Sequence, residues 1–264
     1  MLRLPDIVIY GVIVLLIYSY ANRHKQIANA PLPPEKFEGM LPDADRFDPE
    51  IMIKINRPQS GIGTAFAINK AGKWVTARHV VDGCDSVGIR LDGTRYIPVE
   101  VEVSKRHDLA ILTGSLSQIP IRSDLYNDRQ KGEYGFFFGF PQGRPGEVAG
   151  KLIGRGNMKI RGRYQSDESV LAWAEIGRSL GLKGSLGGLS GAPVLDGDGE
   201  IIGVVSAESQ RRGRIYSVAP KNLRHFIQED DQIEAWAISS DNYGLEADRY
   251  RRRRQITQIV CLVI

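Results

Sequence analysis

The sequence predicts an all-β protein, and three observations support this class. The chain of 264 residues contains 29 glycines and little long helical periodicity, a combination that favours strands and turns over helices. Its short apolar segments are separated by turn residues, as in small β-barrels and sandwiches. With 42% hydrophobic residues, the chain can bury a sizeable core. A length of this order admits one large β domain or two small ones.

The first 49 residues are predicted to form a membrane anchor and a linker. Residues 7–21 are almost entirely apolar, and neighbouring leucines extend this run toward the roughly 20 residues that a spanning helix needs. A cleaved signal peptide is the alternative, but Pro31 directly follows the small-residue cleavage motif and disfavours cleavage. An uncleaved anchor over residues 1–21 is therefore favoured. Residues 22–49 contain five prolines among charged residues, which predicts an extended linker.

The predicted strands fall into two groups, separated by a polar connection at residues 113–132. The first group comprises six segments, at residues 51–55, 61–68, 74–77, 87–91, 96–103 and 109–112. The second group comprises six more, at residues 134–140, 148–160, 170–176, 192–195, 201–206 and 214–218. Six strands with turns between them suit a small barrel or sandwich. Pro220 then introduces a short amphipathic helix at residues 221–227.

Residues 186–195 carry a serine in a turn that is dense in glycine. Gly187, Gly188 and Gly191 permit backbone angles that a Cβ atom would forbid. Such a turn can direct successive N–H groups at one point and stabilise a negatively charged oxygen there. An ordinary β-turn, in which Ser190 has no chemical role, is the alternative. The choice between these two interpretations depends on whether the chain also supplies a histidine and an acid that could act with Ser190.

Two upstream segments supply candidate partners for Ser190. His79 ends a short β-type segment, and Asp108 directly precedes an apolar strand. The order His, Asp, Ser is that of the chymotrypsin-type triad, whereas α/β-hydrolases place the serine first. Ala192 also stands where the G-x-S-x-G motif of α/β-hydrolases needs a glycine. The sequence therefore favours a chymotrypsin-type arrangement.

Four ordered segments make the chain similar to trypsin/chymotrypsin-type serine proteases of the short bacterial kind. They are Gly63–Phe66, Val75–Val80, His107–Leu112 and Gly188–Pro193. The resemblance spans about residues 50–230. It implies two six-stranded antiparallel β-barrels, at about residues 50–115 and 130–220, with the catalytic groups in the cleft between them and a short C-terminal helix. Residues 231–264 are too few for a PDZ domain and are predicted to form a basic C-terminal tail.

The resemblance implies a serine endopeptidase that works through an acyl-enzyme intermediate. Serine is a weak nucleophile at neutral pH and needs a nearby base, and a neutral histidine can take its proton. Ser190 is the expected nucleophile, His79 the general base and acid, and Asp108 the group that orients the imidazole. The expected oxyanion-hole donors are the backbone N–H groups of Gly188 and Ser190.

Other residues near these positions are candidates for the same roles. His107 is a rival base, but in the family pattern the residue before the acid is a flanking residue. Asp82 and Asp85 are rival acids, although their closeness to His79 in the sequence is typical of turn residues. His225 falls on the predicted terminal helix and is expected at the surface or in packing.

One departure from the family pattern bears on activation, and the residues at the pocket positions that the resemblance implies bear on specificity. Leu189 precedes the nucleophile where relatives usually carry Asp or Asn, which excludes activation by a newly cut N-terminus that pairs with that acid. The expected substrate pocket comprises Gly184, Ser206, Glu208 and Arg214. Gly184 offers no carboxylate to a Lys or Arg side chain, and Glu208 and Arg214 are expected to narrow the pocket and pair across it. The alternative is that both side chains point to solvent. These residues predict cleavage after small or medium apolar residues.

Composition limits the partners and the cofactors. Arg249 and Arg251–Arg254 supply five positive charges, more than the formal net charge of +4, so the remainder is near −1 (4 − 5). The protease domain is therefore not expected to bind nucleic acid. The two cysteines, Cys84 and Cys261, predict no disulfide framework. No metal and no cofactor are expected.

The sequence thus predicts a single-pass membrane peptidase, and the resemblance implies that its catalytic domain lies in the periplasm or elsewhere outside the cytoplasm. Its partners would be protein or peptide substrates and the membrane. A catalytically inactive, membrane-tethered binding module on the same fold is the alternative, and its mark would be a broken triad. Because His79, Asp108 and Ser190 are all present, the sequence favours the enzyme.

Overall fold

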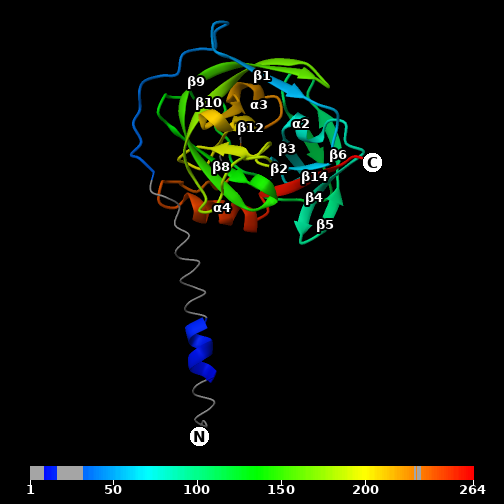
Figure 1. Ribbon diagram of the computed structural model, residues 1–264, viewed down its shortest axis with the longest axis vertical. Helices are drawn as coiled ribbons and strands as arrows, with labels where there is room; N and C mark the ends of the chain where they lie inside the picture. The colour runs from blue at the N-terminus through cyan, green and yellow to red at the C-terminus, as the bar shows by residue number, and fades with distance from the viewer. Residues whose placement is uncertain (1–8, 17–31, 229, 231–232) are drawn as a thin grey trace.

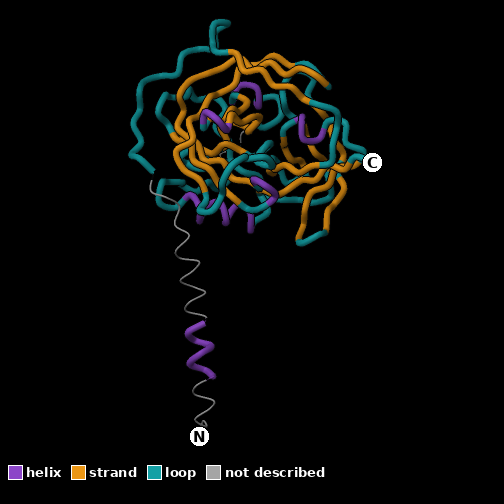
Figure 2. The backbone as a smooth tube through the Cα atoms, viewed as in Figure 1, coloured by secondary structure: helices purple, strands orange, loops and turns teal. Residues whose placement is uncertain are grey.

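The computed structural model describes residues 9–16, 32–228, 230 and 233–264. Strands form most of its regular structure, and the helices are few and short. Figure 2 shows the strands running through the whole folded body, with short helices between them. The strands make two sheets of seven each. The predicted all-β class is therefore confirmed.

The sheet built mainly from the second half of the chain closes on itself. Its strands are β1 (Glu50–Ile55), β8 (Tyr134–Gly139), β9 (Gly146–Gly162), β10 (Ser166–Arg178), β11 (Pro193–Leu195), β12 (Ile201–Ser209) and β13 (Arg214–Val218). Their order is β1-β9-β10-β13-β12-β11-β8, and β8 also pairs with β9. Six strands thus form a ring, here called the second barrel, and β1 lies outside that ring. Phe137 and Trp173 meet edge to face in its core, with ring centroids 5.7 Å apart.

The other sheet, here called the first barrel, closes in a similar way. Its strands are β2 (Gly61–Ala67), β3 (Lys73–Thr76), β4 (Ser86–Asp92), β5 (Arg95–Pro98), β6 (Glu100–Val103), β7 (Ala110–Thr113) and β14 (Ile256–Leu262), in the order β5-β4-β14-β2-β3-β7-β6. Only Val99 separates β5 from β6, and its N–H donates to the carbonyl oxygen of Val87 at 3.0 Å. β5 and β6 therefore run on as one bent strand that links β4 to β7.

The described helices outside the N-terminal segment sit at the connections. They are α2 (Arg78–Val81), α3 (Pro220–Leu223), α4 (Tyr243–Arg252) and the 3-10 turns η1 (Pro141–Gly143) and η2 (Gln210–Arg212). The helix predicted at residues 221–227 is shorter than expected, since α3 ends at Leu223. Pro220 opens it at the first turn, where the missing N–H costs nothing. These connections position the site, because α2 carries His79 and η1 adjoins the serine turn.

The strand predicted to open the first barrel, residues 51–55, lies against the second barrel instead. β1 pairs in parallel with β9 along its whole length. Its isoleucines pack on second-barrel residues such as Met158 and Ile160. Gly156 admits the strand, because a Cβ atom there would lie only 2.1 Å from Cδ1 of Ile51. Alternation of apolar and polar residues marks a half-buried strand, but it does not identify the partner strand.

Of the basic tail expected at residues 231–264, the described residues 233–264 are instead part of the fold. β14 lies between β2 and β4, antiparallel to both, and so completes the first barrel (Figure 1, in red). The preceding helix α4 packs Tyr243 on Phe136 and Tyr250 on Phe138, with ring centroids 5.8 and 5.9 Å apart. Each buried aromatic side chain contributes about 1.5–3 kcal/mol of hydrophobic stabilisation. The tail therefore joins the two barrels.

Cys84 and Cys261 form a disulfide, which corrects the expectation of no such framework. Their Cα atoms lie 5.5 Å apart, although 177 positions separate them in the sequence. The pairing of β14 with β4 brings the two cysteines together. The sequence does not indicate this pairing, so it does not predict the disulfide.

Residues 32–49 lie along the outside of the second barrel (Figure 1, in blue). The carboxylate of Glu35 accepts the N–H of Tyr134 at 2.9 Å. Leu41 is buried, and its N–H donates to the carbonyl oxygen of Arg129 at 2.9 Å. This part of the predicted linker is thus attached to the barrel rather than free.

Residues 9–16, within the predicted anchor, form a helix whose side chains are all exposed. The remainder of the predicted anchor, at residues 1–8 and 17–21, lies outside the described residues, as does the linker at residues 22–31. Among the residues that the structure describes, none of the helices is both long and apolar enough to cross a membrane.

Candidate active site

His79 and Asp108 meet at the end of the first barrel. Nδ1 of His79 lies 2.8 Å from Oδ2 of Asp108, and the backbone N–H of His79 donates to Oδ1 at 2.9 Å. Asp108 is completely buried and stands just before β7, which pairs with β3, the strand ahead of α2. An ionised Asp108 makes Nδ1 the protonated nitrogen and leaves Nε2 able to accept a proton. Within the described part of the chain, Nε2 has no hydrogen-bond partner.

Two side chains from the second barrel complete the surroundings of Asp108. Tyr164, in the β9–β10 turn, donates its hydroxyl to Oδ1 at 2.7 Å. Ser206, on β12, donates to Oδ2. The sequence places Ser206 in the substrate pocket and gives Tyr164 no role, because nothing local marks a tyrosine as a partner of a distant aspartate. The carboxylate thus receives donors from both barrels.

These contacts shift both pKa values in the pair. Burial on its own would raise the pKa of Asp108, but the charge of His79 and the hydrogen bonds to the carboxylate outweigh burial and lower the pKa to about 2. Burial likewise lowers the pKa of His79, yet the charge and hydrogen bond of Asp108 outweigh it and raise that pKa above the ordinary histidine value. Asp108 is therefore ionised at neutral pH and favours protonation of His79.

Among the described residues, neither His107 nor His225 makes the side-chain contact with Asp108 that is expected of the catalytic base. His107 points to Glu168, with its Nδ1 3.0 Å from the carboxylate. Glu168 also accepts the backbone N–H of Asp108 at 2.7 Å, so it supports the loop that carries the aspartate. His225 is exposed on the α3 side of the molecule. His107 is thus a flanking residue, as expected.

The rival acids are engaged elsewhere. Asp82 accepts a hydrogen bond from Nε of Arg163 at 2.9 Å, and Arg163 in turn donates to the carbonyl oxygen of His79 at 3.0 Å. Asp85 accepts the backbone N–H of Ile264 at 2.7 Å. Of the three acids considered from the sequence, only Asp108 contacts the imidazole of His79 among the described residues.

Thr64 on β2 ties the Ser190 turn to the first barrel. Its N–H donates to the carbonyl oxygen of Ser190 at 2.9 Å, and its hydroxyl donates to the carbonyl oxygen of Gly188 at 2.8 Å. The carbonyl oxygen of Thr64 accepts the hydroxyl of Thr76 at 2.7 Å, on the strand that leads to α2. Gly191 has a φ of +82°, and a Cβ atom there would lie 2.2 Å from that hydroxyl. Only glycine at this position lets the turn approach so closely.

The predicted oxyanion donors have no other hydrogen-bond partner among the described residues. Gly188 has a φ of +96°, a conformation that favours glycine. In the described chain, neither the N–H of Gly188 nor that of Ser190 donates a hydrogen bond. The neighbouring carbonyl of Gly187 accepts the N–H of Gln142 at 2.5 Å. The turn therefore presents two N–H groups that can receive an oxyanion.

A small cavity of about 80 Å³ opens beside Ser190. Its lining is largely apolar and comprises Leu186, Gly187, Leu189, Ser190, Val205, Ala207, Glu208 and Ile215. The Glu208 carboxylate accepts the backbone N–H of Leu186, 2.9 Å from each oxygen, and the hydroxyl of Ser185 at 2.5 Å. Hydrogen bonds from the loop ahead of Ser190 thus stabilise the carboxylate of Glu208.

Three of the four predicted pocket residues do not line this cavity. Gly184 uses its carbonyl oxygen to accept a hydrogen bond from Arg178, and Ser206 faces Asp108. Arg214 begins β13 and makes no ion pair with Glu208 among the described residues. The predicted pairing of Glu208 and Arg214 across the pocket is therefore absent there. The β-bulge in β12 near Ala207 shifts the register against β13, which the sequence does not reveal.

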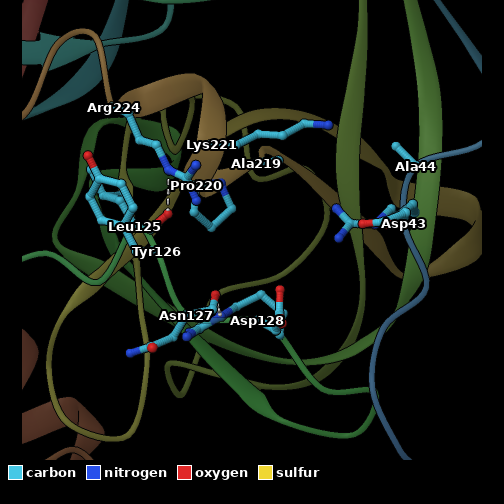
Figure 3. A pocket seen from close by; sticks show the side chains of 12 residues that line it. Asp43, Ala44, Leu125, Tyr126, Asn127, Asp128, Ala219, Pro220, Lys221 and Arg224 are labelled. Carbon is cyan, nitrogen blue, oxygen red and sulfur yellow. Dashed lines mark hydrogen bonds between the residues drawn. The ribbon is translucent and has the colours of Figure 1, made fainter.

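A second cavity, of about 170 Å³, lies between the linker, the loop at residues 125–129 and α3. Figure 3 shows Arg224 above Tyr126, with a hydrogen bond to the carbonyl oxygen of Leu125 at 2.9 Å. Lys221 also borders this cavity. None of the predicted catalytic residues lines it, so we assign it no part in the chemistry.

Three carboxylates on the second barrel lie close enough to suggest a metal site. Asp124, Asp196 and Glu200 have oxygens within 4.8 Å of one another. Arg129 pairs with Asp124 and Asp196, however, and Arg122 pairs with Glu200. Burial raises the pKa of Asp196 to about 6. Arginine side chains thus supply the positive charge that a metal ion would bring, and the cluster is a buried ion-pair network.

Comparison with known proteins gives one family. The family model described as the trypsin-like peptidase domain matches residues 63–204. The uncharacterized protein y4bJ of Sinorhizobium fredii (strain NBRC 101917 / NGR234) is 30% identical over 159 residues, 56% of this chain and 22% of that protein. A probable periplasmic serine endoprotease DegP-like from Marinomonas sp. (strain MWYL1) is 28% identical over 163 residues, 61% of this chain and 33% of that protein. The chain spans about a fifth to a third of the length of these relatives.

A solved structure has the same fold. The active form of the Rv3671c protease from M. tuberculosis superposes with a TM-score of 0.51 at 14% sequence identity. The match covers 80% of this chain and 98% of that one. At this identity the likeness concerns the fold alone.

Proposed function

Because the chain belongs to the trypsin-like peptidase domain family, we propose that it is a serine endopeptidase with the triad His79, Asp108 and Ser190. The observation that carries this proposal is the contact of His79 Nδ1 with the buried carboxylate of Asp108 at 2.8 Å. The glycine turn that carries Ser190 packs against Thr76 and Ala77, just ahead of His79, and the N–H groups of Gly188 and Ser190 have no hydrogen-bond partner within the described residues. A base that is oriented by a carboxylate and lies near a serine is the arrangement that acyl transfer requires.

The proposed mechanism uses each group in turn. Oγ of Ser190 attacks the carbonyl carbon of the scissile bond while Nε2 of His79 takes the hydroxyl proton. The carbonyl oxygen becomes negatively charged and receives the N–H groups of Gly188 and Ser190. His79 then gives its proton to the leaving amine, and the acyl group stays on Ser190. A water molecule, deprotonated by His79, releases the acid and restores the serine.

We propose that the cavity beside Ser190 holds the side chain on the acyl side of the cut bond. Its volume of about 80 Å³ suits a small apolar side chain such as that of alanine or valine. Glu208 is the one carboxylate in the lining described for this cavity, and the N–H of Leu186 and hydroxyl of Ser185 already donate hydrogen bonds to it and turn it toward the loop. Lys and Arg residues should therefore be poor at this position.

The relatives and the disulfide support a location outside the cytoplasm. The Marinomonas relative is described as periplasmic, and disulfides persist mainly in oxidising compartments. We propose the same location for the folded domain, with an anchor over residues 1–21 as a prediction. Protease protection in intact and permeabilised cells tests the location. A domain that stays protected when the outer compartment is opened would contradict it.

The test of the proposed reaction is cleavage of an unfolded protein substrate by wild type, Ser190→Ala and His79→Ala. Each substitution should lower kcat by at least about 10⁴-fold without unfolding the domain. His225→Ala, which changes an exposed histidine, should leave cleavage unchanged. Wild-type protein that binds such substrates but never cleaves them would favour the inactive binding module instead. Cleavage that survives in Ser190→Ala would end the assignment of the triad.

A further inference from the structure

Gln142 lies on η1, directly after β8, and contacts the loop that leads to Ser190. Its side-chain Nε2 donates to the carbonyl oxygens of Lys183 and Ser185, at 2.6 and 2.8 Å. Its backbone N–H donates to the carbonyl oxygen of Gly187 at 2.5 Å. Because all three acceptors are backbone carbonyls, Gln142 binds the loop whatever side chains the loop carries.

The backbone of Gln142 is itself unusual. Its φ of 55° and ψ of 26° lie in the left-handed region, which residues other than glycine adopt only when the surrounding structure holds them there. This conformation directs both the N–H and the side chain toward residues 183–187. A strained residue that makes three hydrogen bonds to one loop is expected to fix the conformation of that loop.

The bond to Gly187 sets the direction of one peptide unit. In a trans peptide the C=O and N–H groups point in opposite directions, and the described residues contain no cis peptide. Since the carbonyl of Gly187 faces Gln142, the N–H of Gly188 faces away from Gln142. If this peptide turned over, it would direct a carbonyl oxygen to the place of the N–H and repel the oxyanion.

Close packing supports the same arrangement. A Cβ atom on Gly188 would lie 2.5 Å from the carbonyl oxygen of Phe140 and 3.5 Å from the backbone nitrogen of Gln142. The connection between β8 and η1 is thus in direct contact with the peptide unit that offers the proposed oxyanion donor. On the basis of the proposed peptidase function, we infer that Gln142 is a positioning residue that keeps the N–H of Gly188 available to the oxyanion.

Kinetics of the full chain test this role, with Gln142→Glu and Gln142→Ala as the variants. Gln142→Glu keeps the length of the side chain but replaces the amide donor with an acceptor. We expect kcat to fall by about 10-fold to 100-fold with KM changed by less than about twofold, because oxyanion donors act in the transition state. A peptide boronic acid, whose adduct with Ser190 places an oxygen in the oxyanion hole, should bind more weakly by a similar factor.

Gln210→Ala is the matched control. Gln210 is also an exposed glutamine beside the same loop, with its Nε2 3.6 Å from where a Cβ atom of Gly184 would lie, but it makes no side-chain hydrogen bond within the described chain. Gln142 variants that match Gln210→Ala in kcat and in boronic acid affinity would overturn the inference, as would a loss confined to KM. Failure of the proposed function would look different, because wild type itself would then neither cleave peptides nor bind the boronic acid.

Discussion

Cys84 and Cys261 join the loop after the His79 helix to the last strand of the chain. The disulfide connects positions 177 residues apart, and β14, which carries Cys261, lies between β2 and β4 in the first barrel. β2 in turn holds Thr64, which binds the Ser190 turn. The C-terminal strand is therefore a structural part of the barrel that supports the catalytic groups.

The first prediction concerns this disulfide. Cys84→Ala with Cys261→Ala should lower the free energy of unfolding by about 2–5 kcal/mol, because the cross-link restricts the unfolded chain. Urea unfolding of wild type with and without reductant measures the effect, and reductant should not change the double variant. Equal stability of the oxidised and reduced wild type would show that the bond contributes nothing.

The second prediction concerns pH. Peptidase activity needs neutral His79, and Asp108 raises the pKa of that histidine above its ordinary value, so kcat/KM should fall as the pH drops through a pKa above about 6.5. Asp108→Asn should lower kcat by about 10⁴-fold. It should also move the acid limb of the profile to lower pH, because burial then dominates the pKa of His79. A profile whose acid limb stays in place or moves to higher pH would contradict the assigned pair.

The third prediction concerns Tyr164. Tyr164→Phe removes one hydrogen bond to the buried carboxylate of Asp108, which should cost about 1.5–3 kcal/mol of stability. Asp108 has a pKa of about 2 in the folded protein, below that of an exposed aspartate. Its ionised form therefore stabilises the fold above about pH 4, and this contribution is lost as the pH falls toward 2.

Without the tyrosine hydroxyl, the pKa of Asp108 should rise, and acid unfolding should begin at a higher pH. Tyr126→Phe is the control, because Tyr126 is exposed and is not among the hydrogen-bond partners of Asp108 in the described chain. Unfolding followed by circular dichroism across the acid range measures both variants. Coincident acid transitions for Tyr164→Phe and wild type would refute the role of this hydrogen bond.

The fourth prediction concerns specificity. Profiling on a peptide library should show cleavage after alanine and valine, with poor use of Lys and Arg. Ile215→Val removes one methyl group from the wall of the cavity beside Ser190 and should improve relative cleavage after leucine by about tenfold. Ile153→Val, on the exposed part of β9, should leave the profile unchanged. A strong preference for Lys or Arg in wild type would exclude the proposed pocket.

Much of the fold class and the His79–Asp108 contact could be predicted from the sequence. Short apolar segments bounded by turns indicate strands, and the ordered histidine and aspartate motifs place His79 shortly after one strand and Asp108 just before another. Once β3 and β7 pair, their ends bring His79 and Asp108 together. These inferences succeed because they depend on local patterns and on the order of motifs along the chain.

The parts that could not be predicted depend on contacts between distant segments. β1 and β14 have the composition of half-buried and buried strands, but composition does not say which sheet receives them. Tyr164 and Gln142 likewise carry no local signal, since their roles come from one hydroxyl and one backbone conformation. The sequence does indicate helix α4, because the buried residues Tyr243, Ala247 and Tyr250 have helical spacing. The run of arginines in the same segment, however, is typical of a solvated tail.

Reaction with a fluorophosphonate probe, mapped by mass spectrometry, tests the central claim most directly. The probe modifies only a serine that a base has activated. We predict one adduct, on Ser190, whose formation is abolished in Ser190→Ala and slowed by at least about 10³-fold in His79→Ala. A folded wild-type protein that forms no adduct, or forms it on another residue, would contradict the proposed triad.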